Sequence, residues 1–130
     1  MLRKILGLGL IVVLLGGCAP MVVPPVDERY WGTWVNEDPD TGGITRIEIA
    51  PWTVHMWGSC EPTDCDWGEA PYAIHEDELR VVWEQGFVVQ VQILEIMPGG
   101  WLEVETVSYF TDGSGTMAMT ERFLREIAIQ

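Results

Sequence analysis

The chain has 130 residues with 20 acidic and seven basic side chains, which gives a formal net charge of −13. This length fits a single domain with one modest hydrophobic core. The strong acidity excludes nucleic-acid binding, because phosphate contacts need a basic surface, and it disfavours electrostatic attachment to anionic lipid.

The first 17 residues have the features of an export signal. Arg3 and Lys4 precede an apolar run, residues 5–17, which is shorter than the roughly 20 residues that a transmembrane helix needs. The run ends in Leu15-Gly-Gly-Cys18, which resembles the lipobox of bacterial lipoproteins. The resemblance implies cleavage before Cys18, diacylation of its sulfur and anchoring outside the cytoplasm, at the outer membrane in a Gram-negative cell. The alternative is ordinary secretion, with Cys18 removed or left free.

The remainder of the chain divides into a tether and a domain. Residues 18–29 are predicted to be a stiff tether, because Pro20, Pro24 and Pro25 favour extended polyproline geometry. Residues 30–130 are predicted to form the domain, which contains all seven tryptophans. Each tryptophan can bury a large apolar area, so this short domain can still build a firm core.

The domain has the alternation of β-strands, and no helical period is evident. Tight turns are predicted at residues 84–86, 98–100 and 112–115. Eight strands result, over residues 30–35, 44–49, 54–58, 67–74, 79–83, 89–93, 102–106 and 116–125. Such an antiparallel meander tends to close, because closure removes both sheet edges. We therefore predict an all-β, eight-stranded meander barrel; the alternatives are a two-sheet sandwich and an open curved sheet.

One short motif agrees with this strand count. Residues Gly32-Thr-Trp-Val-Asn36 resemble the opening strand of the avidins, and Gly-x-Trp alone resembles that of the lipocalins. Both families are eight-stranded barrels in which the tryptophan, Trp34 in this chain, closes one end. The avidin asparagine, matching Asn36, helps to bind biotin. The loop that follows, residues 37–40, departs from the family's short serine-bearing loop, so biotin binding is not expected.

Two cysteines, Cys60 and Cys65, lie in a stretch framed by the pairs Trp57-Gly58 and Trp67-Gly68. In an exported protein they are predicted to form a disulfide. Zinc binding with a histidine is the alternative, but zinc sites need four ligands and usually a closer cysteine spacing. Together with residues 110–115, this stretch resembles small secreted bacterial domains whose activity is not known.

No catalytic or metal-binding residue is predicted. The loop from Asn36 to Gly43 fails the calcium pattern of an EF-hand, because the glycine and glutamate that the pattern requires are missing. Glu103 and Glu105 have the spacing of a glycosidase pair, but alternation places them on the outer face of a strand. We therefore expect neither an enzyme nor a bound cofactor.

The tryptophans leave two functional hypotheses. Most of them are expected in the core, whereas Trp57, Trp67, Trp34 and Asn36 form the candidate binding surface, with Trp57 and Trp67 at a rim beside the cysteine loop. The first hypothesis is an extracytoplasmic module that binds a small ligand or an envelope protein. The second is a structural or envelope-assembly protein with a solid core.

Overall fold

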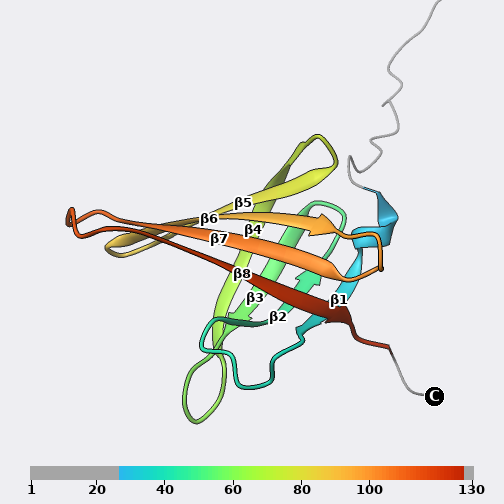
Figure 1. Cartoon of the computed structure of the whole chain (residues 1–130), viewed down its shortest axis with the longest axis horizontal. Coiled ribbons are helices and arrows are strands. Elements are labelled where there is room, and N and C mark those ends of the chain that lie inside the picture. The colour runs from blue at the N-terminus through green and yellow to red at the C-terminus, as the bar shows by residue number, and fades with distance from the viewer. Residues whose placement is uncertain (1–26, 128–130) are drawn as a thin grey trace, which may run out of the picture.

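A computed structural model describes residues 27–127 as one closed antiparallel β-barrel. The strands pair in sequence order, and the last pairs with the first, which confirms the predicted eight-stranded meander (Figure 1). Their bounds are β1 Gly32–Asn36, β2 Ile44–Ile49, β3 Thr53–Gly58, β4 Cys65–His75, β5 Glu78–Gln85, β6 Val88–Ile96, β7 Leu102–Phe110 and β8 Gly115–Arg125. The predicted signal segment (1–17), Cys18 and most of the tether (18–29) lie outside the described residues. Between residues 27 and 127, no helix has the length and apolarity to cross a membrane.

The interior of the barrel is filled with side chains. Along each strand every second side chain points inward, so the apolar members of the alternating pattern meet at the axis. The largest fully buried side chains are those of Trp34, Ile44, Ile47, Met56, Leu79, Leu94, Leu102 and Phe123. The barrel centre is therefore a packed core, as expected when eight strands enclose only enough space for their own side chains.

A 3-10 helix, η2 (Glu28–Tyr30), closes one end of the barrel. Asp27 caps it by accepting a hydrogen bond from the backbone N–H of Arg29 at 2.8 Å. The buried Tyr30 hydroxyl donates to the carbonyl of Asp77 at 2.7 Å and accepts from the backbone N–H of Ile96 at 3.2 Å. Beneath it, the Trp34 indole donates to the Tyr30 carbonyl at 2.9 Å. The last three residues of the predicted tether, 27–29, thus belong to this closure.

At the other end the barrel splits along two seams. β4 and β5 pair only from Tyr72 to His75, and β1 pairs with β8 only from Trp34 to Asn36. Beyond these points β5–β8 continue as a four-stranded sheet that projects away from η2 (Figure 1). We call this projection, residues 82–91 and 107–120, the tongue.

Each seam is filled by a small group of side chains. Between β4 and β5, Trp67 meets Trp83 edge to face, with ring centroids 5.7 Å apart. The Trp67 ring needs the glycine at position 58, because a Cβ there would lie 2.7 Å from its indole nitrogen. Between β1 and β8, the Glu121 carboxylate accepts from Asn36 Nδ2 at 2.8 Å and from Thr41 Oγ1 at 2.6 Å. The seams are therefore closed by side chains where backbone pairing stops.

β6 places a polar residue in the core. Its valines and Ile93 alternate with Gln90 and Gln92, and it is Gln92, not the valine face, that is fully buried. Gln92 Oε1 accepts a hydrogen bond from the Trp83 indole at 2.9 Å, which offsets part of the cost of burying the amide.

Candidate binding surface

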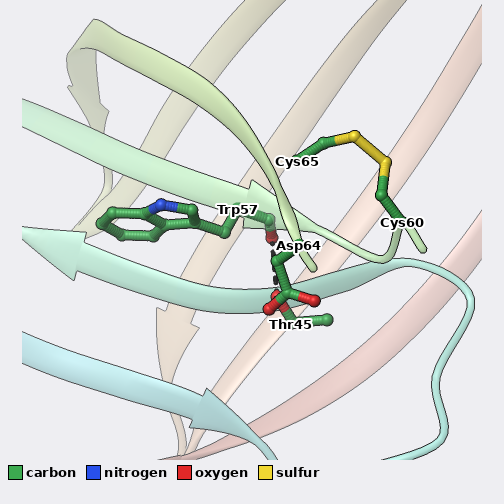
Figure 2. Close-up of a disulfide and its surroundings, with 5 residues drawn as sticks. All are labelled: Thr45, Trp57, Cys60, Asp64 and Cys65. Carbon is green, nitrogen blue, oxygen red and sulfur yellow. Dashed lines mark hydrogen bonds between the residues drawn. A yellow bond between two sulfur atoms is a disulfide. The ribbon is translucent and has the colours of Figure 1, made fainter. Parts of the chain in front are cut away.

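The cysteine loop is a braced connection between β3 and β4. Cys60 and Cys65 form the predicted disulfide, which excludes their thiolates as zinc ligands. Figure 2 shows that the loop is also tied to β2, because the Thr45 hydroxyl bridges the Asp64 carboxylate at 2.7 Å and the Trp57 carbonyl at 3.2 Å. The backbone N–H of Ser59 donates to the Gly43 carbonyl at 2.8 Å. These bonds hold the loop against the barrel wall.

The two tryptophans that frame this loop lie on opposite faces of the wall. A register shift between Met56 and Trp57 changes the alternation, so Trp67 turns inward to the seam while Trp57 points outward. Trp57 stacks on His55 with ring centroids 4.0 Å apart, and the Arg46 guanidinium lies 5.8 Å from its ring centre. The structure thus does not bring Trp57 and Trp67 together at one rim.

His55 belongs to a small polar cluster on this outer wall. Its Nε2 lies 2.6 Å from an Asp66 carboxylate oxygen, which also accepts the backbone N–H of Gly68 at 2.7 Å. The hydrogen bond from His55, and then that from Gly68, holds the pKa of the Asp66 carboxyl below its usual value. Glu69 lies 3.8 Å from the other ring nitrogen. The half-buried Trp57 ring is accordingly part of a packed surface cluster, since His55 covers one of its faces.

Trp34 and Asn36 lie inside the barrel. Trp34 is fully buried, and the Arg125 guanidinium lies 4.3 Å from its ring centre. Asn36 is 8% exposed, and its amide nitrogen donates to the Ile44 carbonyl and to Glu121, both at 2.8 Å. Both side chains are engaged within the fold, where they support the closed end and one seam.

The acidic candidates serve local turns and the outer surface. In the loop after β1, Asn36 Oδ1 accepts the backbone N–H of Asp38, and Asp38 Oδ1 accepts that of Asp40. On β7, Glu103 and Glu105 flank the fully buried Val104 and therefore face outward, as predicted. Over residues 27–127, no group of three or more His, Cys, Asp or Glu side chains is placed to hold a metal ion.

The tongue carries most of the exposed large apolar side chains. Exposed fractions on the tongue are 52% for Val82, 63% for Phe87, 46% for Tyr109, 62% for Met117 and 44% for Met119. Met117 and Met119 lie on the face of the sheet that continues the barrel interior, whereas Val82 and Tyr109 lie on the opposite face. Neither face of the tongue is covered by another sheet. Clustered exposed apolar side chains mark interaction sites on many proteins.

The tips of the two tongue hairpins are fastened to each other. Phe87 and Phe110 stack with ring centroids 6.1 Å apart, and the Thr111 backbone N–H donates to the Phe87 carbonyl at 2.8 Å. Figure 1 shows the two tips side by side, far from η2. The tongue is thus one continuous sheet with a defined surface.

The base of the tongue's inner face is polar. Gln92 and Thr106 form a cross-strand pair there, next to the pair formed by Gln90 and Ser108. In the described part of the chain, Gln92 Nε2, Gln90 Oε1 and Thr106 Oγ1 are buried without a hydrogen-bond partner. An unpaired buried polar group costs about 1–3 kcal/mol. This polar layer marks the boundary between the packed core and the apolar tongue.

Two surface hollows lie at the ends of the barrel. One of about 320 Å³ adjoins η2, where Asp27 and Arg29 form an ion pair at 3.0 Å. The other, of about 350 Å³, lies between the loop after β1 and the β8 edge from Met119 to Arg122. The second hollow leaves open space beside β8.

The tongue was not predicted from the sequence. Alternation identified its strands but could not show that they extend beyond the neighbouring strands β1 and β4, because strand pairing is set by contacts between distant segments. Comparison of the chain with protein-family models, with curated proteins and with solved structures gave no match.

Proposed function

We propose that this chain is an extracytoplasmic lipoprotein whose solid barrel is a scaffold for a partner-binding surface on the tongue. One observation carries the proposal. The barrel interior is occupied by packed side chains, whereas large apolar side chains lie exposed on a sheet that projects from it. A ligand of any size would therefore bind outside the barrel rather than within it.

The anchor in this proposal is Cys18, at the end of the lipobox-like residues 15–18. Each buried methylene of an acyl chain contributes about 0.8 kcal/mol to membrane binding. The eight residues from Ala19 to Val26 span at most about 28 Å when extended, so the barrel would stay near the membrane. Because η2 and the tongue tips lie at opposite ends, the tongue would point away from the anchor (Figure 1).

The proposal is non-enzymatic. The closest histidine–carboxylate pair, His55 with Asp66, lies on the outer wall beside Trp57, and the stacked ring and Glu69 surround the histidine. This is the arrangement of a surface cluster that stabilises the sheet. Biotin binding by the avidin-like motif is likewise not proposed, since the Asn36 amide is engaged with Ile44 and Glu121.

Photo-crosslinking in cells tests the proposed surface. The full chain is expressed with p-benzoyl-phenylalanine at Phe87 on the tongue and, as a matched control, at the exposed Ala73 on the barrel wall. Irradiation is expected to give a discrete protein adduct from position 87 and none from position 73. Equal yields of adduct from both positions, or no adduct from either, would refute the tongue as the binding surface.

A structural role in envelope assembly is the second candidate, and the filled core agrees with it equally well. The same crosslinking experiment distinguishes an assembly role from regulated partner binding. A single envelope component crosslinked in fixed proportion would favour assembly, whereas an adduct that depends on growth conditions would favour regulated binding.

A further inference from the structure

The β8 edge of the tongue presents unpaired backbone groups. β1 ends at Asn36, opposite Phe123, and the last backbone bond across this seam runs from the Glu37 N–H to the Arg122 carbonyl at 2.8 Å. Backbone polar groups in a strand alternate in direction every residue, and the β7–β8 register is unbroken. The N–H and C=O groups of the three residues Thr116, Ala118 and Thr120 therefore face the open side.

This edge lacks the features that keep exposed edges from pairing. Natural edges carry charges, prolines or bulges. The free edge of β4 has Asp66, Glu69 and Pro71, and the free edge of β5 has Glu84. Residues 115–120 of β8 are Gly-Thr-Met-Ala-Met-Thr, with neither charge nor proline. The edge is open to an extended strand.

The residues along the edge are symmetric in sequence. Thr-Met-Ala-Met-Thr, residues 116–120, reads the same in both directions about Ala118. In antiparallel pairing about a two-fold axis at Ala118, Thr116 would lie opposite the partner's Thr120, and Met117 opposite the partner's Met119. Cross-strand threonine pairs and apolar pairs are favourable. The two alanines would meet at the axis as a hydrogen-bonded pair.

The charges of the chain also permit this pairing. A net charge of −13 disfavours most contacts between copies, but the segment itself is neutral. Its neighbour Glu121 is turned inward to Asn36 and Thr41. The next residue, Arg122, is already opposed by Glu37 of the same chain, so the pairing would end before it.

We propose that β8 pairs with β8 of a second copy, antiparallel about Ala118, so that two tongues form one continuous sheet. The pairing would form about six backbone hydrogen bonds, two for each hydrogen-bonded residue pair. The hollow between the loop after β1 and residues 119–122 adjoins one end of the segment that would pair. This inference rests on the proposed function, because it names the partner that the tongue binds.

The test uses the full chain, expressed in cells in two differently tagged copies, with p-benzoyl-phenylalanine at Met117. Irradiation is expected to give a product of twice the monomer mass that contains both tags and joins residues 115–122 of the two copies. Ala118→Pro removes an N–H that faces the open side and leaves the β7 ladder intact, so it should fold normally and reduce this product about tenfold or more. Ala118→Lys places like charges at the axis and should have the same effect; it also covers the case in which the proline variant does not fold.

Three outcomes would overturn self-pairing. A doubled product that survives both Ala118 variants would mean that the copies meet elsewhere. A position-117 adduct to a different protein would reject self-pairing and leave the proposed partner-binding function standing. No adduct from either position 117 or position 87 would reject both.

Discussion

At the scale of single residues, the Tyr30 hydroxyl joins η2 to the barrel. It donates to the Asp77 carbonyl and accepts the N–H of Ile96, so it satisfies two backbone groups from two different segments. Burial is the main reason that the pKa of this hydroxyl lies above its usual value. The ionised form is thus disfavoured in the folded chain.

The first prediction concerns Tyr30 and alkaline pH. Because its pKa is raised by folding, its contribution to stability is complete below the usual pKa of 10.0 and is lost as pH rises through the folded value. Tyr30→Phe leaves two backbone groups without a partner and should cost about 1–3 kcal/mol at neutral pH. Denaturant unfolding at a series of pH values measures the difference in free energy of unfolding between wild type and variant, and this difference should decrease above pH 10.0. A difference in free energy of unfolding that stays constant with pH would contradict this explanation.

A second prediction concerns Asp66. Its pKa is lowered chiefly by the His55 side chain and then by the Gly68 N–H, so its stabilising effect is present above the usual 3.8 and is lost as pH falls through the lower, folded value. His55→Ala should move the pKa of Asp66 upward, yet leave it below 3.8, because the Gly68 bond remains. NMR titration of the carboxyl carbon measures this, with Asp112 as the control carboxylate, since its own Ser114 bonds lower its pKa independently. An unchanged Asp66 titration would show that the histidine is not the main cause.

At the scale of elements, alternation predicted the strands but not always their inward faces. The outward glutamates of β7 were predicted correctly, because that strand runs without irregularity. On β6, Gln92 faces inward and accepts a hydrogen bond from the Trp83 indole. The alternation of β6 alone does not predict this orientation, because it depends on a residue of the neighbouring strand. Between β3 and β4 the register shift separates Trp57 from Trp67. Gly68, with a φ of +86°, lies at this shift, and a glycine within a strand is a signal for such a bulge.

The third prediction concerns the disulfide. Replacement of both Cys60 and Cys65 by serine should lower the free energy of unfolding by about 2 kcal/mol, because the unfolded chain regains the freedom of a short closed loop. The loop should still dock, since Thr45 and Ser59 hold it independently. Thermal unfolding measures the stability of the double serine variant and of a triple variant that also carries Thr45→Ala. Loss of more than about 4 kcal/mol from the serine pair alone would mean that the disulfide organises the barrel itself.

At the scale of the whole molecule, the chain is a small barrel that closes at η2 and opens into a sheet. Its fold class, strand number and disulfide were predictable, because hairpin turns and alternation are local properties. The tongue was not, since it arises where β1 and β4 end before their neighbours do. Of the residues expected to bind, Trp34 and Asn36 lie in the interior, Trp67 fills a seam and Trp57 packs on the outer wall. The exposed apolar surface lies elsewhere.

The central claim is that the β8 edge of the tongue is open in the isolated chain and covered when a partner binds. Hydrogen–deuterium exchange of the peptide spanning residues 115–121 measures this most directly, with the full chain in isolated membranes compared with the same chain purified at high dilution. In the membranes, three amides of this peptide, those of Thr116, Ala118 and Thr120, are expected to exchange more slowly than in the diluted protein. Exchange of peptides from β2 and β3 is expected to be the same in both preparations. Equal exchange of the 115–121 peptide in both preparations would contradict the central claim.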